Sequence, residues 1–249
     1  MYNFFVNSDN KKDDLYFITG NDYNHIKNVL RMKVGDTFLV SCENSSDLCR
    51  ISSIESDTVI AKITEKNYQN TNLPINIFLF QGLPKSDKME LIIQKAVELG
   101  VHSVIPVEMK RCVVKLDDKK KKSKVERWQS IALSAAKQSK RNTVPQISEV
   151  LPYKEALKTA QKLDLLLVPY ECADGMAATK QALLQIKSGM NVGIMIGAEG
   201  GFEQSEIDAA KDAGGTIISL GRRILRTETA AITAAAMCML YSETELEQL

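Results

Sequence analysis

The chain has 249 residues, of which 44% are hydrophobic and 25% charged, and its formal net charge is +1. This length allows one large domain or two modest ones, and the composition is typical of a soluble globular protein. The near-neutral charge identifies no partner, and no apolar run reaches the length of a membrane span.

The cysteine and histidine content argues against a disulfide framework and a zinc site. Five cysteines form no C-x-x-C pair and are odd in number, and there are only two histidines. The N-terminal residues turn polar at once, unlike a secretory signal. We therefore expect a cytoplasmic protein that needs no metal and associates with no membrane.

Residues 1–72 are predicted to form a small β-barrel. Short runs rich in β-branched and aromatic residues alternate with turn signals, and one short helix is expected at residues 22–32. A polar stretch ending in Pro74 marks the boundary of this domain. The expected strands are residues 4–6, 15–18, 37–41, 48–54 and 58–64.

Residues 73–249 are predicted to form an α/β domain. Continuous apolar strands alternate with amphipathic helices, a pattern typical of a mostly parallel sheet covered on both faces. The expected strands are residues 75–81, 102–109, 163–170, 191–197 and 216–221. The expected helices are residues 86–100, 124–139, 179–187, 204–215 and 227–243.

Three strand-end loops are the candidate ligand site, because open parallel sheets bind ligands at the carboxyl ends of their strands. They are residues 168–175, 197–203 and 220–231, and each carries glycine and an acid. The second of them, residues 197–203, is called the glycine loop here. Its sequence matches neither the phosphate-binding pattern of NTPases nor the dinucleotide-binding pattern. It could be a plain strand-to-helix turn, but a turn alone leaves Glu199 unexplained.

The third loop places Arg222, Arg223 and Arg226 around the apolar pair Ile224 and Leu225. These arginines could pair with nearby acids in a solvated loop, although the apolar pair argues against full solvation. Glu228 follows, where its charge suits a helix N-terminus.

Four motifs resemble the RsmE-type ribosomal RNA methyltransferases in order and spacing. They are QGLPKSDKMELIIQKAVELGV, RWQSIALSAAKQSKRNTVPQI, MIGAEGGFEQSEI and LGRRILRTETAA, and HIKNVLRMKVGD is similar to the opening domain of that family. The resemblance implies methylation of ring nitrogen 3 of a uridine in small-subunit (16S) ribosomal RNA, with S-adenosylmethionine as cofactor. It also implies a SPOUT domain with a C-terminal trefoil knot at residues 73–249, a PUA-like RNA-binding barrel at residues 1–72, and a homodimer.

The resemblance also implies roles for individual residues. Glu199 is the candidate base or, equally, a carboxylate that organises the loop, and Arg226 or Arg223 is the candidate partner of the developing oxyanion. The cofactor residues implied are Val168, Pro169, Ile196, Gly197, Gly200, Leu220, Gly221, Ile224, Leu225 and Arg226. RNA needs cations along its phosphates and planar groups for the target base, so the candidate RNA-binding residues are His25, Arg31, Lys85, Lys88, Arg111, Gln138, Lys140 and Arg141.

Two residues depart from the family pattern, and several alternatives stay open. Ala198 replaces a proline, and Glu203 replaces a small hydroxyl residue, so we expect the helix cap to move to Ser205. Residues 119–122, a lysine run, are either an RNA tether or a mobile solvated loop. The other functions considered are a non-catalytic RNA-binding or ribosome-assembly module and a related enzyme with another target base. The substrate could be free RNA or the assembled subunit.

Overall fold

The computed structural model describes residues 1–171 and 175–246. They fall into two compact units, Met1–Asn72 with Ala136–Val144 and Leu73–Ala135 with Pro145–Leu249. The sequence did not indicate that Ala136–Val144 joins the first unit, because this segment directly continues an amphipathic helix.

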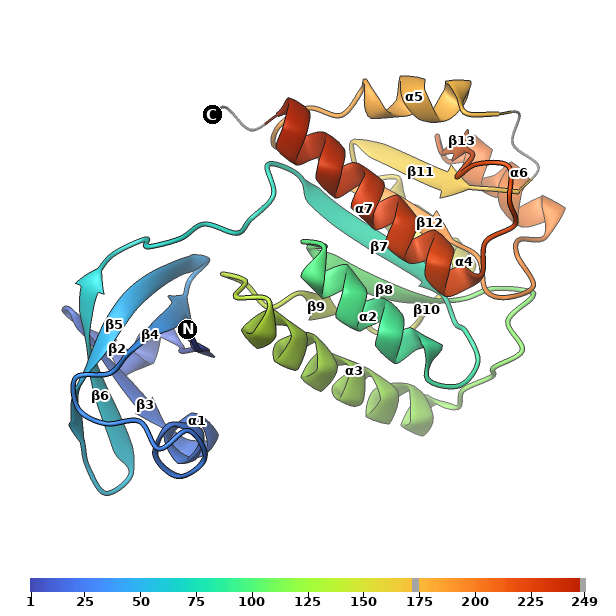
Figure 1. Cartoon of the computed structure of the whole chain (residues 1–249). Helices are drawn as coiled ribbons and strands as arrows, with labels where there is room; N and C mark the ends of the chain where they lie inside the picture. The colour runs from blue at the N-terminus through green and yellow to red at the C-terminus, as the bar shows by residue number, and fades with distance from the viewer. Residues whose placement is uncertain (172–174, 247–249) are drawn as a thin grey trace. The chain divides into compact units, whose positions relative to one another are not determined.

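The first unit is built on a six-stranded mixed sheet (Figure 1). The strand order is β1-β4-β5-β6-β3-β2, in which only the β1–β4 pair is parallel. The predicted helix is a short α-helix, α1 (Gly20–Asn24), followed by a π-helical turn, η2 (His25–Val29), and a 3-10 turn, η1 (Ser8–Asn10), lies near the N-terminus. The strands are β1 (Asn3–Phe5), β2 (Lys11–Lys12), β3 (Leu15–Thr19), β4 (Thr37–Cys42), β5 (Ser45–Ile54) and β6 (Thr58–Glu65).

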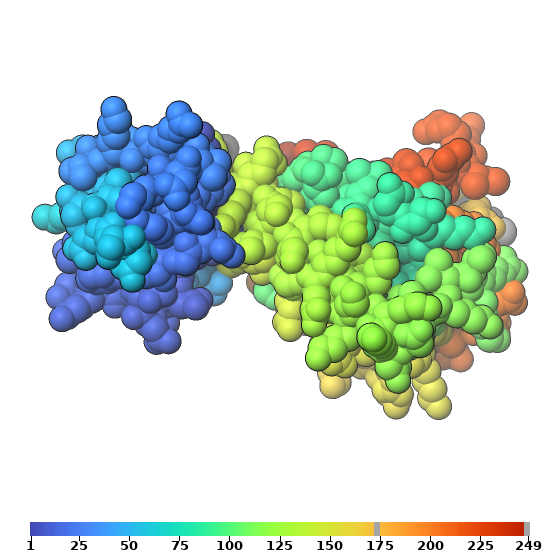
Figure 2. Space-filling view, turned by 90° about the horizontal axis from the view of Figure 1, so that it is seen from below, coloured from blue at the N-terminus to red at the C-terminus, as the bar shows by residue number. Residues whose placement is uncertain are grey.

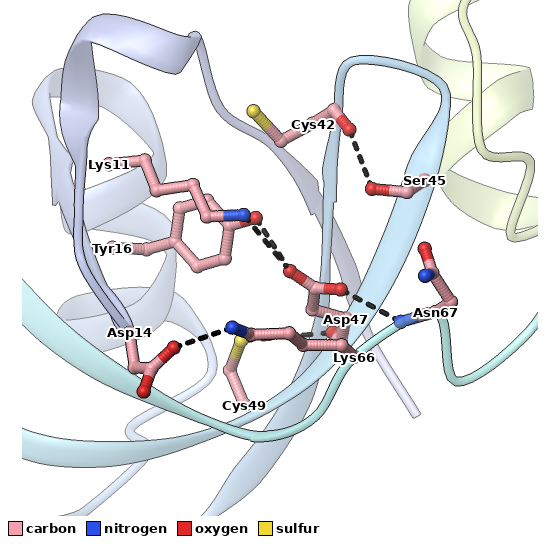
Figure 3. Close-up of polar contacts among 9 residues, drawn as sticks. All are labelled: Lys11, Asp14, Tyr16, Cys42, Ser45, Asp47, Cys49, Lys66 and Asn67. Carbon is pink, nitrogen blue, oxygen red and sulfur yellow. Dashed lines mark hydrogen bonds and ion pairs between the residues drawn. The ribbon is translucent and has the colours of Figure 1, made fainter.

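A buried carboxylate organises the polar part of this unit (Figure 3). Asp47 is 2% exposed and accepts hydrogen bonds from the Tyr16 hydroxyl at 2.8 Å and the Asn67 backbone N–H at 3.0 Å. The Lys11 ammonium lies 3.5 Å from the same carboxylate. Burial and this hydrogen bond raise the pKa of Tyr16, so the phenol stays protonated and donates. Asp47 therefore connects β5, β3 and the chain after β6.

The segment Ala136–Val144 is held in the first unit by its backbone and by Asn142. The Asn3 side chain donates to the Arg141 carbonyl at 3.0 Å, and Asn142 Oδ1 accepts the Thr71 N–H at 2.8 Å. The Arg141 side chain is part of this interior, because the residue is only 5% exposed. Burial in turn lowers the pKa of its guanidinium to about 10.

The second unit contains a seven-stranded sheet in which every recorded pair is parallel. The order is β10-β8-β7-β12-β11-β13, and β9 also pairs with β8. The α/β prediction is confirmed, although the two-residue strands β9 and β10 are too short to have a sequence period. The strands are β7 (Asn76–Gly82), β8 (Ser103–Glu108), β9 (Gln146–Ile147), β10 (Leu151–Pro152), β11 (Leu165–Pro169), β12 (Asn191–Ile196) and β13 (Thr216–Ile218).

Helices cover both faces of this sheet (Figure 1). On one face α7 packs against α2, β7 and β12. On the other face α4 and α6 share an apolar cluster with Phe80 and Met195 of the central strands. The helices are α2 (Lys88–Glu98), α3 (Asp118–Gln138), α4 (Tyr153–Ala160), α5 (Ala177–Leu183), α6 (Gln204–Asp212) and α7 (Thr227–Glu245).

Residues 119–122 are helical, so the prediction of a loop there is wrong. They form the first turns of α3, which lies on the surface beside α2 (Figure 2). An ion pair between Arg127 Nε and Glu90 Oε1 at 2.7 Å connects the two helices.

Four cysteines, Cys42, Cys49, Cys112 and Cys238, are free thiols. Cys172 lies outside the described residues. Across the described ranges, no helix combines the length and apolarity that crossing a membrane requires.

Candidate functional site

A cavity of about 690 Å³ lies where the three predicted loops meet, at the carboxyl ends of β11, β12 and β13. β11 lies between β12 and β13 in the sheet, so the loops after these strands emerge side by side. The walls of the cavity combine apolar side chains, backbone atoms and a few charged side chains.

Most of the predicted cofactor residues line this cavity. They are Pro169, Ile196, Gly197, Leu220, Gly221, Ile224, Leu225 and Arg226. Val168 does not line it, because its side chain is buried in the apolar cluster with α4 and α6. Gly200 does not line it either, and faces Arg111 instead.

The glycines of the site are required mainly where chain segments cross. A Cβ on Gly200 would lie 2.9 Å from the Cβ of Arg111, and a Cβ on Gly82 would lie 2.6 Å from the Ala198 nitrogen. Gly201 lines the cavity with φ at +67°, a conformation that favours glycine. At position 200 the absence of a side chain thus allows the glycine loop to lie close to Arg111.

An ionic cluster joins three segments at the cavity wall. Lys88 Nζ lies 3.2 Å from Glu199 Oε1 and 3.3 Å from Glu228 Oε2. The backbone N–H of Lys85 donates to the same Glu199 oxygen at 2.9 Å. Burial raises the pKa of Glu199, but these N–H and ammonium groups outweigh it, so the pKa lies below its ordinary value.

A buried hydrogen-bond chain connects the ends of β7 and β12 to the start of α7. The Thr227 hydroxyl donates to the Gly197 carbonyl at 2.6 Å and accepts from Gln81 Nε2 at 2.9 Å. Gln81 is fully buried and Thr227 is 5% exposed. The carbonyl at the start of the glycine loop is thereby fixed by Thr227, a residue of the third loop.

The three arginines of the third loop face solvent and the cavity. Arg222, Arg223 and Arg226 all line the cavity and are exposed. Within the described part of the chain, none of them is recorded in an ion pair.

The helix after the glycine loop is capped by an acid pair. The Glu203 N–H donates to Glu206 Oε2 at 2.9 Å, while Glu203 itself pairs with Arg111 Nε at 2.8 Å. The expectation that Ser205 takes over the cap is wrong, because Ser205 lies inside α6 and its hydroxyl accepts from Lys110 Nζ at 2.8 Å.

The predicted RNA residues fall into two groups. His25, Arg31, Lys85, Gln138 and Lys140 are exposed. Arg111 is exposed as well, but both it and Lys88 are engaged with carboxylates, and the Arg141 side chain is buried. Over the residues with described positions, no group of three His, Cys, Asp or Glu side chains is arranged to hold a metal ion.

The sequence did not single out several residues that line the cavity. Thr227 belongs to the motif LGRRILRTETAA. Its hydroxyl side chain at the predicted start of a helix was the sequence feature that could have indicated its role. Two other cavity residues lie just outside the predicted loops, each next to a loop boundary, and that position is the only signal they offer. They are Met176 and Ser219.

Two family models match the chain. An RNA methyltransferase domain matches residues 71–239, and an RNA methyltransferase PUA domain matches residues 18–64. The two matches together cover most of the second unit and, in the first unit, β4, β5 and nearly all of β6.

Curated relatives and a solved structure agree with these matches. The ribosomal RNA small subunit methyltransferase E of Bacillus subtilis is 38% identical, covering 92% of this chain and 91% of its own length. The protein of the same name from Mesomycoplasma hyopneumoniae is 36% identical, with 96% and 99% covered. The crystal structure of the protein of that name from Neisseria gonorrhoeae, bound to S-adenosylmethionine, superposes with a TM-score of 0.81 at 30% identity, covering 96% of this chain and 97% of that one. This chain belongs to the ribosomal RNA small subunit methyltransferase E family of RNA methyltransferases.

Proposed function

We propose that this protein uses S-adenosylmethionine to methylate ring nitrogen 3 of a specific uridine in small-subunit (16S) ribosomal RNA. The observation that supports this most directly is the cavity formed by three strand-end loops, in a chain of this family. The choice of uridine N3 rests on the resemblance of the loop motifs.

The residues present fit the proposed cofactor. Ile196, Leu225 and Phe202 offer apolar walls to a neutral adenine, and Gly197 and Gly201 line the cavity without a side chain. A cavity of about 690 Å³ is within the usual range for a small-molecule site. When bound, the cofactor supplies an activated methyl group on a sulfonium.

The main task of the protein is then to position the target base and stabilise its anion. Uridine N3–H is weakly acidic, so a cation beside the base favours the uridinate that attacks the methyl group. Arg226 and Arg223 suit this role, because they line the cavity and no ion pair within the described ranges occupies them.

Glu199 suits the loop-organising role better than the role of base. Its carboxylate already binds the Lys85 N–H and the Lys88 ammonium, and its lowered pKa makes it a weak proton acceptor. The proton on N3 would then leave to solvent as the arginines stabilise the anion.

RNA binding is proposed for the exposed members of the predicted set that are not engaged with a carboxylate among the described residues. His25, Arg31, Lys85, Gln138 and Lys140 offer cations and polar groups to phosphates and bases. We retain the division into a PUA-like domain at residues 1–72 and a methyltransferase domain at residues 73–249. The trefoil knot, the homodimer and the cytoplasmic location are further parts of the proposal.

Calorimetry and product mapping test the function. We expect S-adenosylmethionine to bind the wild type, and Arg226→Ala to lower kcat about 100-fold while the cofactor still binds. Arg50→Ala is the matched control, because Arg50 is an exposed arginine on β5 of the first unit. Absence of cofactor binding to the wild type would favour a non-catalytic RNA-binding module.

A further inference from the structure

Lys88 occupies an electrostatically unfavourable place in its helix. It is the first residue of α2, where the helix dipole disfavours a positive charge. Its side chain is only 28% exposed, so it also loses much of its hydration. A lysine here is favourable only if other groups compensate for both costs.

Two carboxylates from distant segments provide that compensation. Glu199 belongs to the glycine loop and Glu228 to the first turn of α7, and both lie within 3.3 Å of the same ammonium. The Glu228 side chain is 15% exposed and that of Glu199 is 23% exposed, so solvent screens these pairs only partly. Lys88 thus connects three chain segments, all of which contribute residues to the cavity wall.

This geometry leaves Lys88 little capacity to bind a phosphate. Its positive charge faces two negative charges, so the cluster carries a net charge of −1 and would repel an RNA backbone. Lys85 differs, because its exposed side chain has no ion pair recorded among the described residues and only its backbone N–H binds Glu199.

We propose that Lys88 is a positioning residue for the cofactor cavity and not an RNA ligand. By holding Glu199 and Glu228 together, it fixes the glycine loop relative to the start of α7. This inference rests on the proposed function, since it assumes that S-adenosylmethionine enters the cavity between those segments.

The test compares Lys88→Met with Lys88→Arg and the matched charge removal Lys85→Met in the full-length chain. Calorimetry measures the affinity for S-adenosylmethionine, and titrations of a small-subunit rRNA transcript give the salt dependence of RNA binding. Methyl-transfer kinetics separate kcat from KM for RNA. Thermal unfolding identifies the temperature range in which all variants are folded.

For Lys88→Met we expect about a tenfold loss of cofactor affinity and an unchanged RNA salt dependence. The kcat should fall while KM for RNA stays the same, and Lys88→Arg should restore most of the cofactor affinity because arginine can still bridge two carboxylates. Lys85→Met should bind the cofactor normally. It should lower by about 1 the salt slope, which is the slope of the logarithm of RNA affinity against the logarithm of salt concentration.

Two results would overturn the inference. Unchanged cofactor affinity in Lys88→Met would remove the positioning role, and a salt slope lowered by about 1 in that variant would make Lys88 a phosphate ligand. If Lys88→Met does not fold, the charge-removing variant Lys88→Gln takes its place and the same two results decide. Failure of the wild type to bind S-adenosylmethionine would instead refute the proposed function.

Discussion

Replacing Thr227 with valine removes one hydroxyl from the buried chain that fixes the glycine loop. The side chains have nearly the same shape, so packing is retained while two hydrogen bonds are lost. The Gly197 carbonyl loses its donor at 2.6 Å, and Gln81 Nε2 loses its acceptor at 2.9 Å.

The cost follows from the burial of the groups left behind. Gly197 and Gln81 are both buried, and an unsatisfied buried polar group costs about 1–3 kcal/mol. Gln81 Nε2 keeps its other bond, to the Gly82 carbonyl at 2.9 Å. We therefore expect Thr227→Val to lower the free energy of unfolding of the second unit by about 2–4 kcal/mol.

Urea unfolding followed by tryptophan fluorescence measures this cost. Trp128 is the single tryptophan of the chain, is 4% exposed and belongs to the second unit, so it reports on that unit. Thr227→Ser is the matched control, because it keeps the hydroxyl and loses one methyl group worth about 1 kcal/mol.

The comparison of the two variants tests the reasoning. Thr227→Val should be the less stable variant and should also bind S-adenosylmethionine more weakly, because the loop carbonyl is no longer fixed. Equal stability of the serine and valine variants would show that the hydroxyl contributes nothing, and the buried chain would lose its assigned role.

Three further changes have defined outcomes. Asp47→Ala leaves the Tyr16 hydroxyl and the Asn67 N–H without their buried acceptor, so hydrogen exchange of the β3 and β5 amides should show a loss of about 2–4 kcal/mol; slower or unchanged exchange would contradict this. Because the folded pKa of Glu199 is lowered from 4.5, its stabilisation is present above that pH and is lost as pH falls through the folded value. Acid unfolding below pH 4.5 should therefore be less steep in Glu199→Gln, and identical acid profiles would refute the assignment. Replacing exposed Lys119 and Lys122 of α3 by glutamine should lower the RNA salt slope by about 2 without loss of stability, whereas an unchanged slope would identify them as solvent-facing charges.

The sequence predicted the alternation of strands and helices in the second unit because apolar periodicity is a local property. β12 and α7 begin at the expected residues. The lysine run at 119–122 was harder to predict, because a charged segment has no apolar period even where it forms the first turns of α3. α4 (Tyr153–Ala160) was missed for a related reason, since eight residues give few periodic positions.

The candidate site was predicted at the level of loops but not of contacts. Motif resemblance located the three loops, and the structure places them around one cavity. The contacts that organise it join residues far apart in sequence, such as Gln81 with Thr227 and Lys85 with Glu199. The need for glycine at position 82 likewise arises only where β7 meets Ala198. A single sequence contains no local signal for such contacts.

Transfer of a labelled methyl group from S-adenosylmethionine to unmodified 16S ribosomal RNA tests the central claim most directly. Free RNA and assembled small subunits are both offered, and mass spectrometry of nuclease fragments identifies the modified atom. We expect one methyl group, on N3 of a single uridine, and its loss in Arg226→Ala. A methyl group on another base or on a ribose, or no transfer to either substrate, would contradict it.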